Sequence, residues 1–518
     1  MSLGRDLTTV GTATLLSRLL GFCRDVGIAA LLGAGVLSDA YFAALQIPNL
    51  FRRLLAEGAI NAAFVPMWLR VREERGAGGT RLFGESVLGA MLTVLGALAL
   101  LCLVFTPTVV HLVAPGFTLD EPRFALAIEF TRLSIPYVAL VGLVCVGAAV
   151  LNAEGHVAAA VYGIVVFNAV LLVTVAVVAV SGGRGMPWAG AAFALAIAIG
   201  GLAQLLLVGG AVLQLDVAPP RRPRWSHSPE VRRFFAKALP GVIAGGIPQL
   251  KFMAGAMVAS SSQAGVSWLY YANRLYELPL GVASVAIASV MVPRIAASVR
   301  AGSDSEFAAM QSRAFEIACG VALPAAVGFA VLAELISGGL FERGAFGPRD
   351  TAAVAAALAA ICAGLPGHVL EKVFGAVSFA HEDTRTPMFA ALCGLATSVV
   401  GAILLFPTFG HVGVAAAIAV SGWVGAGTLG LVLLRRRWLR LDAQALYRLP
   451  RIVLATLAMG VITALVCHAL PVAAHVGIGR IAALAALVLF GLGCYLGSLQ
   501  VLGVARISTL LAATRARF

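Results

Sequence analysis

The sequence predicts an all-α polytopic membrane protein with about fourteen transmembrane helices, arranged as two six-helix lobes plus two C-terminal helices. The first observation is composition: 60% of the 518 residues are hydrophobic and 12% are charged, and the mean hydropathy is +0.96. A soluble domain cannot bury that much apolar surface. The other observations are a regular succession of long apolar segments and a one-sided distribution of basic residues between them.

Each apolar segment is long enough to cross a bilayer, because about 20 residues of helix span its hydrocarbon core. No cleavable signal pattern precedes the first segment, which is interrupted by Arg18 and Arg24. In chain order, we predict helices over residues 8–31, 38–68, 86–113, 126–153, 157–181, 188–214, 234–261, 266–299, 307–341, 352–380, 387–407, 411–435, 449–471 and 478–503.

The net charge of +13 is concentrated in alternate connections, which include residues 217–233, residues 435–451 and both chain ends. Lys and Arg accumulate on the cytoplasmic side of membrane proteins, so the charge does not indicate nucleic-acid binding. The pattern predicts an even number of crossings and a cytoplasmic (inner) membrane protein with both ends in the cytoplasm. The opposite connections hold only Arg123, Arg184, Arg343, Arg349 and Arg480.

A weak internal repeat suggests duplicated halves. GAAVLNAEGH (147–156) resembles GAVSFAHEDT (375–384), and AFVP (63–66) resembles VMVP (290–293), at shifts of 228 and 227. Halves of six crossings would be related by an axis near the membrane normal, with a site between them; chance similarity of apolar sequence is the alternative. The predicted division is an N-lobe (1–216), a cytoplasmic linker along the anionic leaflet (217–233), a C-lobe (234–436) and C-terminal helices with a tail (437–518).

The segment 38–68 carries charge where a membrane helix rarely tolerates it. Its acidic and basic residues are Asp39, Arg52, Arg53 and Glu57. Arg53 and Glu57 are four residues apart and can pair, whereas no acid lies three or four residues from Arg52. Pro48 removes a backbone donor and predicts a kink. The alternative is a pair of arginines that extend to the headgroup layer.

Two other segments place polar residues at helical spacing. Residues 8–31 contain Ser17, Arg18, Gly21, Arg24 and Asp25, and residues 266–299 contain Tyr270, Asn273, Arg274 and Glu277 on one face. Together with residues 52–53 they predict a cationic cavity suited to diphosphate or carboxylate, because a guanidinium donates two parallel bonds. The alternative is a set of buried ion pairs that lock helices together. Structural or interfacial roles are expected for Lys251 and Glu334, and no role is assigned to Glu371–Lys372.

Several activities lack their motifs. No Lys follows a Gly, which excludes a phosphate-binding P-loop, and neither HExxH nor a metal-binding cysteine spacing occurs. We therefore expect no cofactor and no metal. The short connections leave no room for a catalytic domain, so an enzyme is not expected.

Three segments carry a family resemblance: SRLLGFCRD (17–25), SDAYFAALQIPNLFRRLLAEGAINAAFVP (38–66) and VSWLYYANRLYELPLG (266–281). They resemble the MurJ (MviN) family, bacterial flippases of lipid II, the undecaprenyl-diphosphate-linked peptidoglycan precursor. The family fold is that of the multidrug/oligosaccharidyl-lipid/polysaccharide exporters. The resemblance implies that Arg18, Arg24, Arg52 and Arg274 line the cavity, and that Asp25, Asp39, Arg53, Glu57 and Glu277 occupy motif positions. All nine are predicted to bind the substrate. Asn273 departs from the Asp of many relatives, and no acid cluster matches the sodium site of some members.

The resemblance predicts a lipid II flippase that works by alternating access, with lipid II and membrane lipids as partners and other cell-wall synthesis proteins as candidate partners. A monomer without nucleic acid is expected. One alternative is a flippase for another polyprenyl-linked glycan or a drug/ion antiporter of the same superfamily, although an antiporter for cationic drugs favours an acidic cavity. Another is a membrane glycosyltransferase, which requires a carboxylate in a sizeable extracytoplasmic loop.

Overall fold

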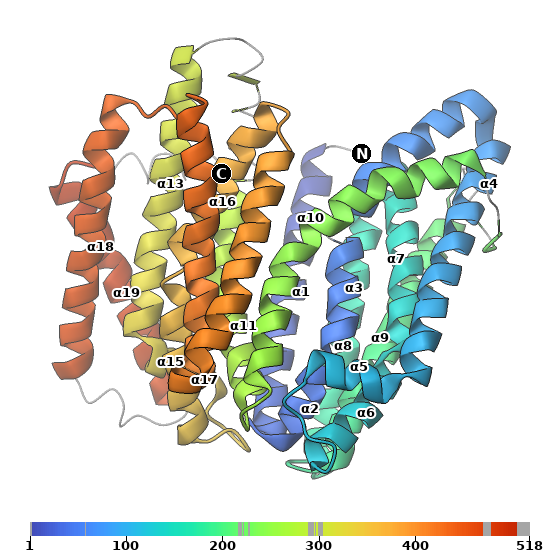
Figure 1. The fold of residues 1–518 in the computed structure, drawn as a ribbon, viewed down its shortest axis with the longest axis horizontal. Coiled ribbons are helices and arrows are strands. Elements are labelled where there is room, and N and C mark those ends of the chain that lie inside the picture. The colour runs from blue at the N-terminus through green and yellow to red at the C-terminus, as the bar shows by residue number, and fades with distance from the viewer. Residues whose placement is uncertain are drawn as a thin grey trace. The chain divides into compact units, whose positions relative to one another are not determined.

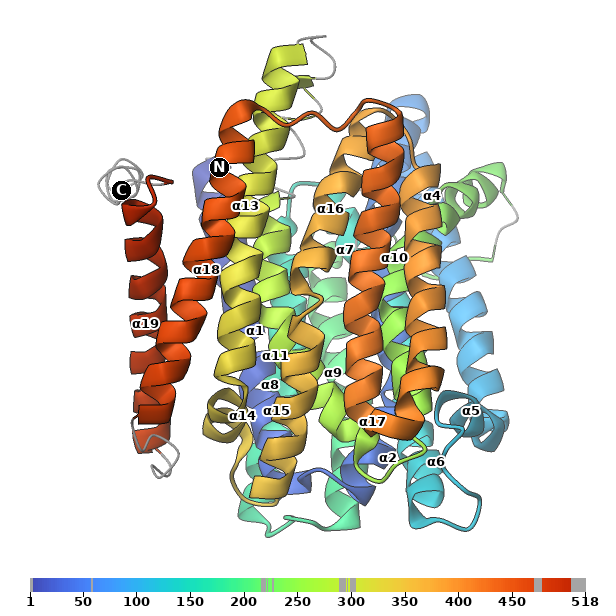
Figure 2. The same cartoon turned by 60° about the vertical axis from the view of Figure 1, so that its left-hand side comes forward.

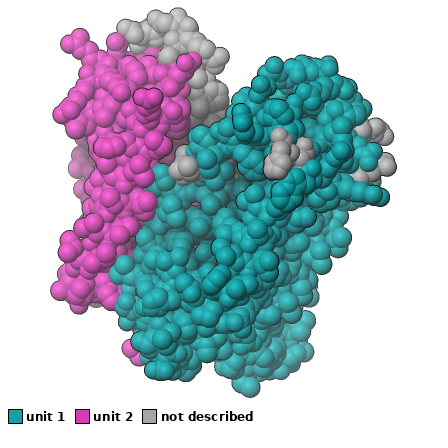
Figure 3. Space-filling model, turned by 45° about the vertical axis from the view of Figure 1, so that its right-hand side comes forward, with its two compact units in different colours: residues 1–267, 343–347 teal, residues 268–342, 348–518 magenta. Residues whose placement is uncertain are grey.

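The computed structural model describes residues 3–56, 59–215, 220, 222–225, 228–287, 295, 297–298, 304–469 and 478–504, and the regular structure in these ranges is helical. The chain divides into two compact units, coloured in Figure 3. Unit 1 comprises residues 1–267 and 343–347, and unit 2 comprises residues 268–342 and 348–518.

Unit 1 contains the helices from the N-terminus through the linker (Figure 1). They are α1 (Leu3–Leu32), α2 (Val36–Ala44), α3 (Gln46–Ala56), α4 (Ala59–Val104), α5 (Thr106–Val113), α6 (Pro122–Ser134), α7 (Pro136–Ala153), α8 (Val157–Val180), α9 (Pro187–Leu213) and α10 (Pro229–Ala259).

Unit 2 contains the remaining helices (Figure 2). The first of them, α11 (Gly265–Ala286), begins in the last residues of unit 1. It is followed by α13 (Asp304–Val331), α14 (Ala333–Phe341), α15 (Pro348–Cys362), α16 (Leu365–Ala380), α17 (Arg385–Arg435), α18 (Ala443–Ala469) and α19 (Ile478–Val501).

Within the described residues the predicted crossings recur as helices, and several are interrupted. Most of the crossing predicted over 266–299 beyond residue 287, with the match VMVP (290–293), lies outside those residues. The segment predicted over 38–68 comprises α2, α3 and the start of α4, with a break at Leu45. Pro48 lies in the first turn of α3, three residues after this break. Because proline has no N–H, it cannot donate to the carbonyl four residues earlier, at the end of α2, and the predicted interruption of the helix is confirmed. Breaks also separate α4 from α5, α6 from α7, and α13 from α14.

Two glycines divide the longest helices. Gly76 in α4 has φ 63° and ψ −166°, and Gly410 in α17 has φ 56° and ψ −138°; side chains disfavour positive φ. The division at Gly410 matches the predicted boundary between 387–407 and 411–435. The two halves of α17 lie side by side in Figure 2. A Cβ at Gly401 would lie only 3.0 Å from the Cβ of Ala417, so the halves approach closely there.

The helix bounds support the internal repeat. The short sequence matches are 227 and 228 residues apart, and the same separations relate corresponding helix ends in the two parts of the chain. They separate the starts of α5 and α14 (Thr106, Ala333), the ends of α7 and α16 (Ala153, Ala380) and the starts of α8 and α17 (Val157, Arg385). The turns after α7 and α16 also share a positive φ, at Gly155 (79°) and Glu382 (59°).

The compact units do not follow the predicted lobe boundary. The linker was predicted to separate an N-lobe ending at 216 from a C-lobe beginning at 234, yet α10 packs against α3 and α4 in unit 1. The division into duplicated lobes remains a prediction. Within the described ranges, nine helical stretches are long and apolar enough to span a membrane, and bent α10 adds a tenth. This confirms a many-helix membrane protein, while the number fourteen remains a prediction.

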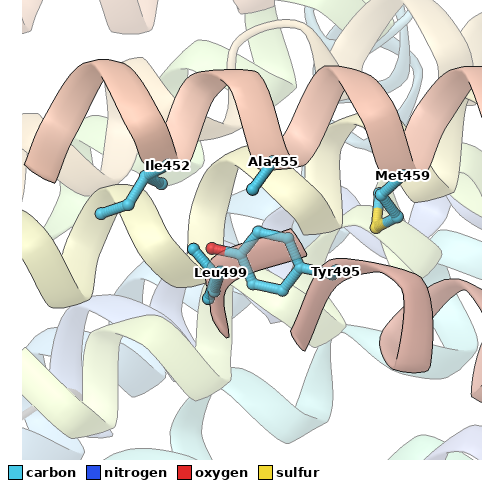
Figure 4. Packing of buried hydrophobic residues seen from close by; sticks show 5 residues of the cluster. All are labelled: Ile452, Ala455, Met459, Tyr495 and Leu499. Atoms are coloured by element: carbon cyan, nitrogen blue, oxygen red, sulfur yellow. The ribbon is translucent and has the colours of Figure 1, made fainter. Parts of the chain in front are cut away.

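The two C-terminal helices pack on α13 in unit 2 (Figure 4). Their contact is a buried cluster of Ile452, Ala455 and Met459 from α18 with Tyr495 and Leu499 from α19. The Tyr495 hydroxyl donates a hydrogen bond of 2.8 Å to a carbonyl oxygen of α13, that of Gly320. A buried hydroxyl needs such a partner, and this bond ties α19 to the rest of unit 2.

Candidate functional site

Arg24 is held by a short ion pair inside unit 1. Its Nε and Nη2 donate to Asp25 Oδ1 at 2.9 and 2.6 Å, and its Nη1 donates to Asn168 Oδ1 of α8 at 3.1 Å. The side chains of Arg24 and Asp25 are 15% and 2% exposed. Charge-assisted bonds of this length fix the plane of a guanidinium, so Arg24 is a positioned cation.

Asn168 is oriented by a second residue of α1, Ser17. Its Nδ2 donates to the carbonyl and the hydroxyl oxygens of Ser17, both at 3.2 Å, which leaves its Oδ1 directed at Arg24. Ser17 belongs to the polar stripe that the sequence predicted, whereas Asn168 was not predicted. The signal for it was a polar residue within an otherwise apolar helix.

Arg24 of α1 and Arg52 of α3, two of the predicted basic residues, both lie near Tyr137. Arg52 is half-buried on α3, a helix that packs against α7. Arg52 and Arg24 both exert an electrostatic influence on the hydroxyl of Tyr137, a buried residue of α7. The structure therefore brings Arg24 and Arg52 into one region of unit 1.

The other predicted basic residues occupy different environments. Arg18 is exposed on α1, and Arg53 is half-buried in the last turn of α3. Glu57 lies outside the described residues, so its pairing with Arg53 remains a prediction.

Asp39 is enclosed by protein groups. It is 0% exposed. It accepts hydrogen bonds from the backbone N–H groups of Ala264 (2.8 Å) and Ser267 (2.9 Å) and from the Ser267 hydroxyl (2.8 Å), and it lies 3.6 Å from Arg123. The carboxylate thus holds α2 to the start of α11. This placement favours a structural role over the substrate contact that the sequence predicted.

The predicted polar face of α11 is its half-exposed face. Tyr270, Asn273, Arg274 and Glu277 are half-buried, while the intervening residues 271–272 and 275–276 are buried. Arg274 Nη1 lies 3.5 Å from Glu277 Oε2, and Asn273 Nδ2 donates to Glu277 Oε1 at 3.2 Å. Glu277 therefore orients two neighbours, as its spacing predicted.

A histidine on α16 extends this polar region of unit 2. His368 Nδ1 lies 2.8 Å from the hydroxyl of Tyr276 and 3.1 Å from the Gly364 carbonyl. The acids Glu277 and Glu371 act electrostatically on the same hydroxyl. His368 was not predicted, although Glu371 and Lys372 lie three and four residues after it in the same segment.

The remaining predicted charges are dispersed. Lys251 is buried in α10 and is 5% exposed, Glu334 is exposed in the first turn of α14, and Lys372 is exposed on α16. Among the described residues, no group of three or more His, Cys, Asp or Glu side chains is arranged to hold a metal ion.

The family model described as lipid II flippase MurJ matches residues 28–478. The chain belongs to the MurJ family. A probable lipid II flippase MurJ of Rhizobium meliloti (strain 1021) is 40% identical over 468 residues, covering 89% of this chain and 86% of the relative. The lipid II flippase MurJ of Burkholderia cenocepacia (strain J2315) is 30% identical over 457 residues, 86% of this chain and 87% of the relative.

Solved structures support the fold of the MurJ family. A lipid II flippase MurJ in an inward closed conformation has a TM-score of 0.78 at 21% identity, covering 95% of this chain and 98% of that one. An inward-facing multidrug resistance transporter of the MATE family has a TM-score of 0.67 at 15% identity, covering 83% and 98%. The latter belongs to the MOP superfamily, so the predicted superfamily fold is confirmed.

Proposed function

We propose that this MurJ-family chain moves lipid II from the cytoplasmic to the periplasmic leaflet by alternating access, as a transporter and not as an enzyme. Membership of the family supports the substrate. The structural observation that supports it most is the positioned guanidinium of Arg24, which shares an electrostatic environment with Arg52. Such groups suit a diphosphate, because each guanidinium can donate two parallel bonds to phosphate oxygens.

In unit 2, Arg274 provides a further guanidinium, oriented by Glu277. We propose that Arg18, Arg24, Arg52 and Arg274 act on the diphosphate and the sugar–peptide head. Asp25 and Glu277 act as the groups that orient two of these arginines.

The membrane setting follows from charge. The bias of basic residues supports a cytoplasmic-membrane protein with both ends in the cytoplasm. The absence of a GK phosphate loop in the sequence supports the membrane potential or an ion gradient as the energy source; one charge moved across 100 mV is worth about 2.3 kcal/mol. We propose a monomer whose further partners are cell-wall synthesis proteins.

Depletion of the protein in its host tests the proposal. Lipid II at the outer face is measured with a membrane-impermeant probe, and total lipid II is measured in parallel. We expect total lipid II to rise while its outer-face share falls, and plasmid-borne wild type to restore both. An unchanged outer-face share after depletion, in a strain with no second flippase gene, would contradict lipid II transport. Accumulation of another polyprenyl-linked glycan would favour the alternative substrate.

A further inference from the structure

A mostly apolar cavity of about 180 Å³ lies in unit 1 at the end of the linker. It is bounded by α4, α7 and α9 (Figure 1), of which α7 packs against both others, and by two linker prolines. Leu213, which is 57% exposed, belongs to its lining, so the cavity is partly open at the surface of apolar helices. The lining includes Leu88 of α4, Gly147 of α7, Gly209 of α9 and the linker residues Pro220 and Pro223.

The linker is fitted to α4 at this place. The backbone N–H of Arg224 donates to the Glu85 carbonyl at 2.8 Å. A Cβ at Gly89 would collide with the Arg224 backbone, so only glycine permits this approach of the chain. Pro220 is buried against Gly84. The segment therefore covers the cavity as a built part of the fold.

Basic side chains surround this cover. Arg222 and Arg224 are exposed on either side of Pro223, and Trp225 is 69% exposed. Arginine binds phosphate through parallel hydrogen bonds, and tryptophan is enriched at the membrane–water interface. Basic segments next to a membrane helix attract anionic lipids of the cytoplasmic leaflet, and the charge pattern assigns this linker to that side.

We propose that the cavity and the linker form a binding site for one anionic phospholipid. One acyl chain enters the cavity, and the phosphodiester contacts Arg222 and Arg224. The volume of about 180 Å³ is many times the ~10–15 Å³ that one water-sized group requires, so the cavity accommodates a stretch of chain. The bound lipid contacts the linker together with α4, α7 and α9. None of these contacts involves Arg24 or Arg52.

Two glycines of α9 provide a matched pair for testing the tail site. A Cβ at Gly209 or at Gly210 meets no atom within 4 Å, but only Gly209 lines the cavity. Both substitutions by leucine replace glycine in a helix, which favours folding equally. Gly209→Leu fills the cavity, and Gly210→Leu does not.

The probe is phosphatidylglycerol with a diazirine in one acyl chain, added to the purified full-length protein in detergent, followed by photolysis and peptide mapping. For the wild type and Gly210→Leu we expect labelled peptides from α4, α7 or α9 around the cavity. For Gly209→Leu we expect at least a fivefold loss of that label. Equal labelling of the two variants, or label confined to other helices, would overturn the tail assignment.

The headgroup is tested with Arg222→Gln/Arg224→Gln against Arg385→Gln/Arg435→Gln, two exposed arginines of unit 2. We expect the linker variant to lose at least threefold of the cavity label, and the control to lose none. A phosphatidylcholine probe that labels the wild type equally would overturn the requirement for an anionic lipid. Undecaprenyl phosphate that displaces the probe more efficiently than unlabelled phosphatidylglycerol would assign the cavity to a polyprenyl chain. None of these readouts depends on lipid II transport.

Discussion

Arg24 and Arg274 are held in different ways. Arg24 bonds to the buried carboxylate of Asp25 at 2.6 Å, whereas Arg274 lies 3.5 Å from a Glu277 side chain that is 23% exposed. The first guanidinium is bonded to both Asp25 and Asn168, whereas the ion pair of the second is longer and more exposed. Substitution of Arg24 should therefore test the need for a fixed cation. Substitution of Arg274 should test the need for the hydrogen-bond geometry of a guanidinium.

Arg24→Ala should abolish growth support in a depletion strain while the protein still inserts into the membrane. The change removes the positioned cation and leaves Asp25 buried without it, and breaking a buried pair costs ~3–5 kcal/mol. Growth and membrane abundance are measured together. Asn168→Ala, which removes one bond to Arg24, is the milder comparison and should support slower growth. Full complementation by Arg24→Ala at normal abundance would remove Arg24 from the site.

Arg274→Lys tests whether the site requires a guanidinium or only a charge. Lysine keeps the attraction for an anionic head but loses the two-bond geometry, and a charged hydrogen bond is worth ~1.5–3 kcal/mol. We expect lipid II affinity to fall about tenfold to a hundredfold, and further for Arg274→Ala. Native mass spectrometry of the purified variants measures their affinity for lipid II. Wild-type affinity of the Lys variant would show that charge suffices.

The residues that sequence reasoning identified share one property, which is regular spacing. The polar face of α11 was predictable because its members recur every three or four residues. Asn168 stands alone in an apolar helix, so no period identifies it. His368 lies three residues before Glu371, but no role had been assigned to that pair of positions. The role of Asp39 depends on a turn 225 residues away, at Ala264, and no local pattern can show such a partner.

At the scale of elements, Asp39 holds the start of α11 to α2. Asp39→Ala should lower the thermal stability of the purified protein, because two backbone donors and a hydroxyl lose their acceptor. Each buried unsatisfied group costs ~1–3 kcal/mol. Asp120→Asn, at an exposed position, is the control and should leave the unfolding temperature unchanged. An unaltered unfolding temperature for Asp39→Ala would show that the network contributes no stability.

Asp383 joins α16 to both ends of α17. It accepts a hydrogen bond from the Thr386 backbone N–H at 3.1 Å and pairs with Arg436. Burial raises the pKa of Asp383, but the bonds from Thr386 and the Arg436 charge outweigh burial and hold that pKa below its usual 3.8. The stabilisation is therefore present above about pH 4 and lost as the pH falls through the folded-state pKa.

Unfolding temperatures measured from neutral pH down to about pH 3 test this linkage. Asp383→Asn should be less stable than the wild type near neutral pH, and the difference should shrink as Asp383 becomes protonated. A difference that stays constant over the whole range would contradict the proposed ionisation.

The helices themselves were largely predictable, because long apolar runs and charged turns mark their ends. The boundary at Gly410 and the kink near Pro48 follow from backbone chemistry that a sequence shows directly. The breaks between α4 and α5 and between α13 and α14 were not predicted, although Pro107 in the first turn of α5 marks the first of them. No proline lies within three residues of Leu332. Both breaks recur at the same shift as the repeat, which supports the predicted duplication.

At the scale of the whole molecule, composition predicts a membrane protein, and the distribution of charge predicts its orientation. The assignment of α10 to unit 1 was not predictable, because packing against α3 and α4 leaves no trace in hydropathy. Linker packing on α4 likewise depends on Gly84 and Gly89, which local sequence gives no reason to pair with residues 220–224.

Orientation is tested by a single cysteine at position 224 in a background without the eight native cysteines. Because the basic linker should face the cytoplasm, Arg224→Cys should resist a membrane-impermeant thiol reagent in intact cells and react after permeabilisation. A cysteine at exposed Leu119, in an opposite connection, should react in intact cells. Labelling of position 224 in intact cells would contradict the predicted orientation and place the linker on the periplasmic side.

Transfer of lipid II by the purified protein is the most direct measurement. Vesicles containing fluorescent lipid II and the reconstituted chain are treated with an impermeant quencher, with and without a membrane potential. With wild type, quenching should proceed beyond the outer-leaflet fraction when the potential has the physiological sign, and with Arg24→Ala it should stop there, as in protein-free vesicles. Wild-type vesicles that stop at the outer-leaflet fraction under either sign of potential or under imposed ion gradients, although the protein is folded, would contradict lipid II transport by this chain.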